Sequence, residues 1–473
     1  MINKNLWKYL SAVLLVSLMV LSAFTVSMNY NNSESFEEQY LKRFDERFES
    51  EASLGSPYET EKTCSYIINK VGTYYYALNG TTGRLQFYST NASYVIQSAI
   101  NAGGQTILTR GTYTVNNTIC LTDTAQSLVG NGKSTILQLA DGADCNVINI
   151  TGTAKWFQEV RNLKIDGNKD QQTKGNGIYI SHTYGGSEDA HTLIEDVWVS
   201  NTKENGIWIA DDSREVRLEN VLVSDALKAG FRIGGTDHKI IQCTAEDCGT
   251  DGFLIDYSGN TQLTNCKAFD CGLTGEDGQG FNVEGADRVQ LVNCQSQDNR
   301  HHGFVIYVTN DGLFVACQAD SNSKHYAGFC GFRIDDSNGN VIVGCAAFDT
   351  DATKKQAYGI QVTDTCYNNT ITNNNLLGNK NGAMSISSTA LANNAVNYNM
   401  GFVTENSGTV TNSTATTFVF NHGLAGTPTG VWASFNSTEI TGWTWTATST
   451  EITITVVGMT ADRTCYWMAE YKP

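Results

Sequence analysis

A short motif recurs nine times between Gly177 and Gly382, and it constrains the fold more than any other feature of the sequence. Each copy consists of a glycine, an apolar residue, any residue and then, usually, isoleucine or valine. Successive glycines lie 22 to 29 residues apart. A fixed period in this range is typical of a solenoid, in which each repeat stacks on the next. The copies begin at Gly177, Gly206, Gly230, Gly252, Gly280, Gly303, Gly331, Gly359 and Gly382.

Each repeat also predicts a second strand, marked by a small apolar residue at one equivalent position and often by an aspartate four residues later. The marked positions are Val221, Cys243, Cys266, Cys294, Cys317 and Cys345, and the aspartates are Asp225, Asp247, Asp270, Asp298 and Asp349. Apolar residues alternate with period two, which excludes helical and leucine-rich repeats. We therefore predict an all-β chain dominated by a right-handed parallel β-helix, a single-chain solenoid whose coils stack about 4.8 Å apart.

The start of the chain differs from the repeats. Residues 1–28 hold two lysines and then an uncharged run of 19 residues from Leu10 to Met28, which is long enough to span a bilayer. We favour an uncleaved membrane anchor, with a cleaved signal peptide as the alternative. Lysines before the run and acidic residues after it place the rest of the chain outside. Either interpretation predicts an extracellular or cell-surface protein.

Two further segments flank the predicted β-helix at residues 63–400. Residues 29–62 predict a stalk, because aromatic residues recur at i, i+4 spacing in a short amphipathic helix. Residues 405–473 contain four tryptophans and alternate in a way that predicts about five strands of a small β-sandwich-like domain. These tryptophans either fill the core or stack on sugars. The stalk and the C-terminal domain are the two candidates for contacts in a homo-oligomer.

Charge and cysteine content narrow the set of partners. A net charge of −17 argues against nucleic acid, whose phosphates need clustered Lys and Arg. Of the 13 cysteines, five form an inner ladder by their spacing, and buried thiols in such a ladder need no disulfide. The Cys and His spacings of zinc sites do not occur. Asn-x-Ser/Thr sequons are frequent and agree with an exported glycoprotein.

A distinctive order of elements precedes the repeats. A helix with Ala99-Ile100 is followed by Gly103-Gly104, an apolar strand, Gly111-Thr112-Tyr113, a strand with Thr118-Ile119, and a turn with Gly130 and Gly132 before Ser134-Thr135. This order resembles the pectate-lyase-like superfamily, including its rhamnogalacturonase- and epimerase-like domains, over residues 85–390. The resemblance implies a β-helix that binds a polysaccharide or a surface glycan. Members include lyases, hydrolases, epimerases, phage tailspikes and non-catalytic surface proteins.

The resemblance leaves the reaction open. Of the four polygalacturonase motifs, Asn-Thr-Asp, Asp-Asp, Gly-His-Gly and Arg-Ile-Lys, the sequence contains only Asp-Asp, at Asp211-Asp212 and Asp335-Asp336. Pectate-lyase chemistry, with carboxylates around Ca²⁺ and a basic residue that takes a proton, has no diagnostic motif in this sequence.

Coil length identifies one arc of the solenoid as the candidate site. Between Gly252 and Cys345 each glycine lies 14 residues before its cysteine, whereas the return to the next glycine takes 9 or 14 residues. The extra residues fall in what we name the variable arc, at 272–279, 323–330 and 352–358. Its short copy, Arg300-His301-His302, lies between two long copies. We expect it to form a notch roughly 10 Å across, with both histidines in a surface turn.

Outward positions of the Gly-apolar-x-Ile strands carry aromatic, arginine and carboxylate side chains, which suit a sugar chain. We predict four catalytic acid/base residues at the notch: His301, His302, Glu284 and Asp335. The predicted substrate-binding residues are Arg300, Tyr307, Arg333, Asp256, Arg232, Trp208 and Tyr326. For hydrolysis, Asp256 and Glu284 are one coil apart, roughly 5 Å, and Glu284 and Asp335 are two coils apart, roughly 10 Å. We prefer the second pair, because it straddles the notch.

Calcium is the one cofactor that the sequence suggests. Asp336, Asn338 and Asn340 lie in one short turn and offer the oxygen ligands that Ca²⁺ prefers. Ordinary β-helix turns use the same residues, so a purely structural turn is the alternative.

Two functions remain open. The first is an exported, carbohydrate-active β-helix protein that cleaves or epimerises a polysaccharide. The second is a non-catalytic adhesin, glycan-binding module or envelope component. Histidine, arginine and carboxylate groups that converge in a groove favour the enzyme, whereas residues spread along a flat face favour the adhesin.

Overall fold

A computed structural model describes residues 64–153, 155–182, 191–275, 278–412, 416–458 and 463–472. The membrane anchor or signal peptide predicted at residues 1–28 and the stalk predicted at 29–62 lie outside these ranges. None of the helices within the ranges combines the length and the apolar character that crossing a membrane requires.

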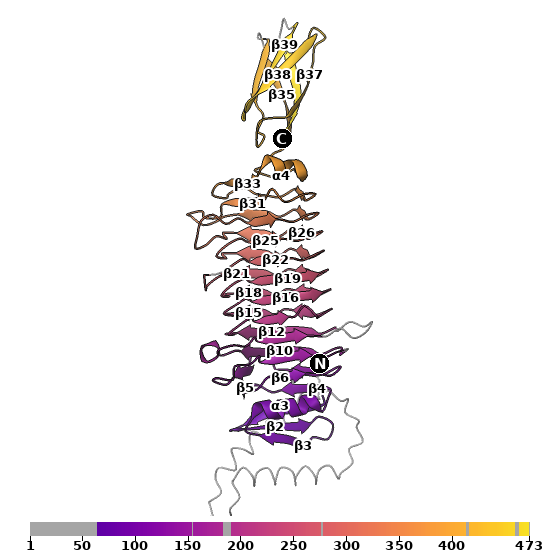
Figure 1. The fold of residues 1–473 in the computed structure, drawn as a ribbon, viewed down its shortest axis with the longest axis vertical. Helices are drawn as coiled ribbons and strands as arrows, with labels where there is room; N and C mark the ends of the chain where they lie inside the picture. Colours follow the sequence, from indigo (N-terminus) through magenta and orange to yellow (C-terminus); the bar gives the residue numbers. More distant parts are fainter. Residues whose placement is uncertain are drawn as a thin grey trace, which may run out of the picture. The chain divides into compact units, whose positions relative to one another are not determined.

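One face of each coil belongs to a sheet that is 11-stranded in the described ranges, with neighbouring strands parallel and in register (Figure 1). It contains the Gly-apolar-x-Ile motifs. Its strands are β6 (Ile119–Leu121), β9 (Ile148–Thr151), β11 (Ile178–Ser181), β13 (Ile207–Ile209), β16 (Phe231–Thr236), β19 (Phe253–Gly259), β22 (Phe281–Glu284), β25 (Phe304–Tyr307), β28 (Phe332–Asp335), β31 (Tyr358–Val362) and β33 (Gly382–Ile386). Successive residues alternate between a buried and an outward position, as in Phe281–Glu284. We name the outward side of this sheet the outer face.

The other two faces of each coil belong to one larger sheet, 23-stranded in the described ranges, which forms two columns of short parallel strands. The first column contains β14 (Arg217–Glu219), β17 (Lys239–Ile241), β20 (Gln262–Thr264), β23 (Gln290–Val292), β26 (Leu313–Val315), β29 (Val341–Val343), β32 (Thr370–Thr372) and β34 (Ala395–Asn397). The second contains β15 (Leu222–Ser224), β18 (Thr244–Glu246), β21 (Lys267–Phe269), β24 (Gln295–Gln297), β27 (Gln318–Asp320) and β30 (Ala346–Phe348). Stacked coils of this kind confirm the predicted parallel β-helix.

The sequence predicted one further strand per repeat, and the structure shows two. A residue with positive φ bends the chain between them, as at Gln242 (φ 54°), Asn265 (φ 56°) and Asn293 (φ 54°). Asparagine tolerates this left-handed conformation better than most residues, so one residue suffices for the bend. The repeated aspartates mark the next bend, since Asp247 and Asp270 have φ values of 54° and 50°.

Two regular columns of side chains lie among the buried apolar residues of the interior. Phe231, Phe253, Phe281, Phe304 and Phe332 stack along the 11-stranded sheet, with ring centroids 4.5 to 4.9 Å apart. The predicted ladder of Cys243, Cys266, Cys294, Cys317 and Cys345 is confirmed as buried and unbridged. Each thiol donates to backbone carbonyls, and several reach the preceding coil, as from Cys294 Sγ to Leu263 O at 3.5 Å. The thiol column therefore ties neighbouring coils together.

The start of the solenoid combines a helix with several strands. Helix α3 (Ala92–Asn101) contains Ala99-Ile100, as predicted, and is capped by Asn91, whose side chain accepts from the Tyr94 N–H. Its apolar side packs against the coils through Val95, Ile96 and neighbouring residues. The strands of this region are β1 (Tyr66–Val71), β2 (Tyr74–Asn79), β3 (Leu85–Ser89), β4 (Gln105–Leu108), β5 (Gly111–Val115), β7 (Ser127–Val129), β8 (Thr135–Leu139), β10 (Glu159–Asp166) and β12 (Leu193–Ser200), and a 3₁₀ turn spans Lys169–Gln171.

Two three-stranded antiparallel sheets follow helix α4 (Ser388–Asn393). In the first sheet the strand order is β35 (Glu405–Asn412), β40 (Arg463–Glu470), β37 (Gly430–Phe435). In the second it is β36 (Thr417–Asn421), β39 (Glu451–Val457), β38 (Gly442–Ala447). The five predicted strands are present, and β35 is additional. Trp467 is buried in the core of these sheets, whereas Trp432 is 48% exposed.

Candidate functional site

Four polar side chains form one row on the outer face, one from each of four successive strands. Asp256 on β19 pairs in register with Glu284 on β22, Glu284 with Tyr307 on β25, and Tyr307 with Asp335 on β28. The parallel ladder sets neighbours in this row about 4.8 Å apart. Asp256 and Glu284 are therefore adjacent, whereas Tyr307 stands between Glu284 and Asp335.

Two arginines on the same face neutralise the ends of this row. The Arg232 guanidinium lies 2.8 Å from an Asp256 oxygen, and that of Arg333 lies 2.7 Å from Asp335. The Thr363 hydroxyl lies 2.9 Å from the other Asp335 oxygen, at donating distance. Each terminal carboxylate thus has a fixed position, because charge-assisted hydrogen bonds to arginine are strong and directional.

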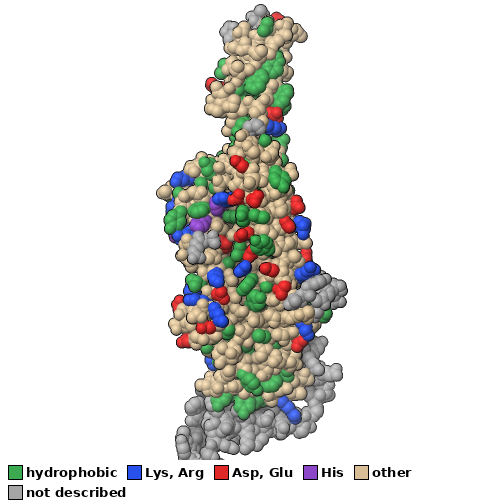
Figure 2. Space-filling view, viewed as in Figure 1, with side chains coloured by type: hydrophobic (Ala, Val, Ile, Leu, Met, Phe, Trp, Pro, Cys, Tyr) green, Lys and Arg blue, Asp and Glu red, His purple; other side chains and the backbone are tan. Residues whose placement is uncertain are grey.

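An aromatic group continues the outer face toward the N-terminus. The rings of Tyr179 and Trp208 meet edge to face at 5.0 Å, and the Arg232 guanidinium lies 4.9 Å from the Trp208 ring centre. The next position, Gly234, leaves room for the Asp211 carboxylate, since a Cβ there would lie 2.2 Å from Asp211 Oδ1. Figure 2 shows this face, with acidic side chains in red and apolar side chains in green along the stretch that Figure 1 labels β16 to β25.

The predicted notch is bridged by Arg300. Its guanidinium lies over the Tyr326 ring at 4.7 Å, donates to the Tyr326 hydroxyl at 3.0 Å, and donates to Gly272 O at 3.4 Å. Arg300 therefore joins the long copies of the variable arc on both sides. Tyr326 is 55% exposed and offers a stacking surface at this edge.

The two histidines have different environments. The His301 ring stacks on Phe329 with centroids 4.1 Å apart. His302 is only 5% exposed, so the expectation that both lie in a surface turn is wrong for His302. Burial, followed by the charges of Arg333 and His301, lowers the pKa of His302 to about 3. Its Nδ1 accepts from the Cys330 N–H at 2.9 Å, so the neutral ring carries its proton on Nε2.

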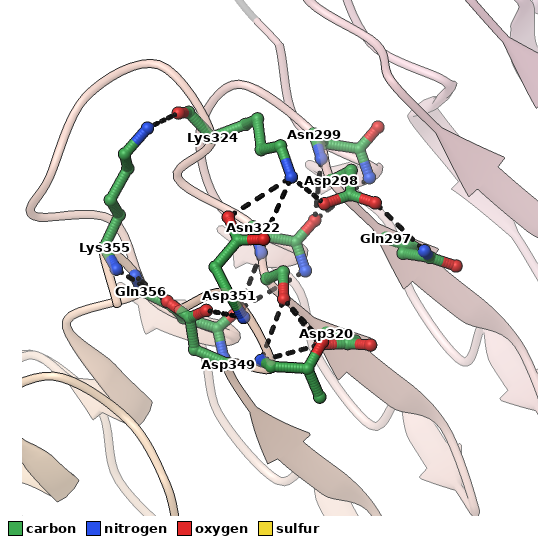
Figure 3. Close-up of polar contacts among 12 residues, drawn as sticks. Gln297, Asp298, Asn299, Asp320, Asn322, Lys324, Asp349, Asp351, Lys355 and Gln356 are labelled. Carbon is green, nitrogen blue, oxygen red and sulfur yellow. Dashed lines mark hydrogen bonds and ion pairs between the residues drawn. The ribbon is translucent and has the colours of Figure 1, made fainter. Parts of the chain in front are cut away.

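A polar network that the sequence did not predict holds the long copies of the variable arc (Figure 3). The Lys324 ammonium lies between the carboxylates of Asp298, at 2.6 Å, and Asp351, at 3.2 Å. The buried Asp349 carboxylate accepts from the backbone N–H groups of Asp351, Lys355 and Gln356. The repeated aspartate Asp298 was visible in the sequence, but Lys324, which joins it to Asp351, lies in an insertion outside the repeat.

Two of the three predicted calcium ligands, Asn338 and Asn340, make hydrogen bonds within the fold. Asn340 is fully buried, its Oδ1 accepts from the Gly312 N–H at 2.7 Å, and its Nδ2 donates to Thr309 O. The Asn338 side chain accepts from the Tyr367 N–H. Among the described residues, no group of three or more His, Cys, Asp and Glu has an arrangement that could hold a metal ion.

The structure thus gathers the predicted residues into two neighbouring sets. Asp256, Glu284, Tyr307, Asp335, Arg232, Arg333 and Trp208 share the outer face, and Arg300, His301, His302 and Tyr326 lie at the notch. The polar groups of the first set follow one another strand by strand along the face. Asp211, Thr363 and Phe329 were missed. Gly234 has no side chain in an otherwise occupied outward row, and Asp211-Asp212 occupies the turn of the preceding coil. This gap in the row could have predicted that Asp211 fills the space.

Comparison with known proteins supports the fold. The family described as a right handed beta helix region matches residues 184–346, so the chain contains a right-handed β-helix. The search of curated proteins yields no match.

Two solved structures are similar in fold. The A-module of a mannuronan C-5 epimerase from Azotobacter vinelandii has 16% identity and a TM-score of 0.51, covering 66% of this chain and 95% of that one. The enzymatically active domain of bacteriophage CBA120 tailspike protein 2 has 17% identity and a TM-score of 0.54, covering 77% of this chain and 62% of that one. This chain therefore spans less than two thirds of that tailspike domain.

Proposed function

We propose that the protein binds a polysaccharide along the outer face and cleaves or epimerises it there. The observation that carries this proposal is the in-register row of Asp256, Glu284, Tyr307 and Asp335. A strand spacing of about 4.8 Å is close to the length of one sugar unit, so successive strands can address successive units. The epimerase and the tailspike enzyme named above share the fold, which makes an activity on a glycan a natural hypothesis.

Glu284 is the proposed proton-transferring residue. It lies between Asp256 and Tyr307, close enough to both for cooperation on one sugar unit. Asp256 and Asp335 already accept from arginines, which suits groups that keep a charge and a position. His301 and Tyr326 at the notch would contact the sugar that leaves the row. His302, buried and bonded to Cys330, would position the variable arc.

The test is turnover by the full chain over a panel of polysaccharides. Products are assayed as new reducing ends, as unsaturated sugars by ultraviolet absorbance, and as epimers by NMR. Glu284→Gln is expected to lower turnover at least about 100-fold, as loss of a general acid or base does. The matched control is Glu246→Gln, since Glu246 is a half-buried carboxylate on β18 of the other sheet. Equal turnover by the two variants would end the proposal for Glu284.

A non-catalytic glycan-binding protein is the second candidate. The observation that favours it is the spread of the row along the face, with both end carboxylates engaged by arginines. Binding of a glycan without any of the three products would select this function. In that case the glycan affinities of Glu284→Gln and Glu246→Gln are compared instead of their turnover.

Export and anchoring belong to the same proposal. We place the β-helix outside the cell and residues 1–28 in the membrane, because the run from Leu10 to Met28 carries no charge. Mass spectrometry of the mature N-terminus decides between the two alternatives: an intact N-terminus supports the anchor, whereas a start near Met28 supports a cleaved signal peptide.

A further inference from the structure

We infer that the polysaccharide is uncharged and that the reaction on it is hydrolysis with retention of the anomeric configuration. This inference rests on the proposed function and narrows its substrate and its chemistry. The substrate class comes from the charges of the outer face, and the stereochemistry comes from the order of side chains in the row.

Carboxylates dominate the outer face from β11 to β28. Three lie on the strands, at Asp256, Glu284 and Asp335. Two more come from the turn after β13: Asp212 accepts from the Ser181 hydroxyl at 2.9 Å, and Asp211 lies over Gly234. We name these five carboxylates the acidic strip, which extends along the face beyond the row.

The positive charges of the face are already engaged. Among the described outward positions of β11 to β31, the cations are Arg232 and Arg333, and each contacts a carboxylate of the face. Arg232 also lies on the Trp208 ring, and Arg300 at the notch is held by Tyr326. On the strands, two guanidinium groups stand against three carboxylates, and each already contacts one of them. The turn after β13 adds two carboxylates, Asp211 and Asp212, and one cation, Arg214.

A polyuronate would meet repulsion on such a face. It carries one carboxylate per sugar, within one strand spacing of the acidic strip, a distance at which like charges repel appreciably at low ionic strength. An uncharged sugar chain instead offers hydroxyl donors that suit carboxylate acceptors. Its ring faces can stack on Tyr307, whose side chain is 40% exposed. The face therefore favours a neutral chain over the uronate chain in the name of the similar epimerase.

An uncharged sugar also limits the chemistry. Elimination and C5 epimerisation both remove the proton at C5, which is acidic only beside a carboxyl group, and a neutral hexose has none. The remaining way to cleave a glycosidic bond is hydrolysis, which needs a carboxylate and a carboxylic acid across the bond. Water then supplies the hydroxyl group of one product and the proton of the other.

The order of the row selects the pair. Glu284 and Asp335 are two strand spacings apart, but the Tyr307 side chain occupies the position between them, where inversion needs a water. Asp256 and Glu284 are direct neighbours, about 4.8 Å apart, close to the separation in retaining enzymes. Arg232 stabilises the negative charge of Asp256, which suits a nucleophile. We assign this pair in place of the pair that the sequence favoured.

The proposed hydrolysis on Asp256 and Glu284 takes two steps, and every bond and proton is accounted for. Asp256 attacks the anomeric carbon and forms an ester, while the glycosidic oxygen leaves with the proton of Glu284. Water then attacks the same carbon, gives its proton to Glu284 and releases Asp256. Two inversions give net retention.

The first experiment measures binding and turnover of the full chain with three probes: neutral hexose polymers, polymannuronate and polygalacturonate. Each probe is measured at low ionic strength under two separate conditions, one with EDTA and one with added Ca²⁺. We expect neutral polymers to bind and to yield reducing ends. Polyuronate affinity should rise about threefold to tenfold in Asp211→Asn, since one repulsive charge is removed. Glu246→Gln on the other sheet is the charge-matched control and should leave this affinity unchanged.

The second experiment follows the first-formed anomer of the product by NMR. Retention is expected in the wild type, with turnover lost in Asp256→Asn and in Glu284→Gln but only reduced in Asp335→Asn. Circular dichroism and melting temperature confirm that these surface variants fold. An inverted product, or loss in Asp335→Asn with activity kept in Asp256→Asn, overturns the assignment of the pair.

The outcomes separate this inference from the proposed function. Tight binding or turnover of a polyuronate by the wild type, with EDTA or with Ca²⁺, overturns the inference and leaves the proposed function standing. Failure of every polymer to bind overturns both. Turnover of a neutral polymer with retention supports both.

Discussion

The interior of the solenoid and its variable arc are built in opposite ways. In the interior, one kind of side chain occupies one position in coil after coil, as in the Phe253-to-Phe332 stack. In the variable arc, each copy is fixed by its own contacts: Arg300 with Tyr326, Lys324 with Asp298 and Asp351. The interior therefore provides a repeating scaffold, and the arc can change without disturbing it. If this contrast holds, substitutions should cost progressively less stability from the interior toward the arc.

The largest effect is expected at the centre of the phenylalanine stack. Phe281 is fully buried between Phe253 and Phe304, at 4.7 and 4.9 Å. Phe281→Ala should lower the free energy of unfolding by about 3–5 kcal/mol, because it leaves a cavity that neighbouring coils cannot fill. Chemical denaturation measures this change. Val305→Ala, on the outward side of the next strand, is the control and should cost about 1 kcal/mol or less.

The second-largest loss of stability is expected in the column of buried thiols. Cys294 is fully buried, and Cys294→Ser should cost about 1–3 kcal/mol, since a hydroxyl there is desolvated and poorly paired. Hydrogen bonding with Cys266 and burial raise the pKa of the Cys294 thiol, so it should resist alkylation in the folded protein at neutral pH. Rapid labelling of the ladder thiols without unfolding would contradict their structural role.

A pH effect is expected where the arc joins the interior. The pKa of His302 is lowered to about 3, against about 6.5 in an unfolded chain. The unfolded state therefore binds the proton more readily between these values. Stability should be constant above pH 6.5 and fall by about 1–2 kcal/mol by about pH 5. Burial likewise lowers the pKa of His238 to about 4, so it adds to this slope.

The variant His302→Asn isolates the contribution of His302. Asparagine can keep an acceptor for the Cys330 N–H and cannot be protonated. Melting temperature against pH should have a shallower slope in this variant than in the wild type. An unchanged slope would show that His302 has no share in the acid response.

The smallest effect is expected within the arc itself. Lys324 is partly exposed, and its ion pairs with Asp298 and Asp351 are screened by solvent. Lys324→Met should therefore change global stability by less than about 1 kcal/mol. Limited proteolysis is the more sensitive measurement, with faster cleavage at residues 323–330 expected in the variant. A large loss of global stability would mean that the arc is part of the scaffold after all.

The same contrast explains what could be predicted from the sequence. The β-helix, helix α3 and the buried thiols were predictable, because a repeated position needs the same kind of residue each time, as at Cys266 and Cys294. The outward row was also predictable, since alternation in a strand fixes which residues face out. The split second strand was missed, because it depends on a single left-handed residue such as Asn265.

Residues of the variable arc were predicted less well, because repetition says nothing about them. Arg300 was predicted to bind substrate, and this role stays a prediction, but its bridge between two copies of the arc was not foreseen. His302 was expected at the surface, and Phe329, six residues into a separate insertion, covers it. Contacts between insertions of different coils depend on packing that no periodic pattern encodes.

In-register pairing along the 11-stranded sheet also limits how the site can change. The distance between any two outward residues in one row is a whole number of strand spacings, about 4.8 Å each. Removing the coil from Gly280 to His302 would shorten such distances by one step, bringing Asp256 next to Tyr307. The backbone positions that carry the carboxylates are thus separated by whole strand spacings. For a given pair of residues, a change from a retaining to an inverting separation therefore requires the gain of an entire coil between them, and the reverse change requires the loss of one.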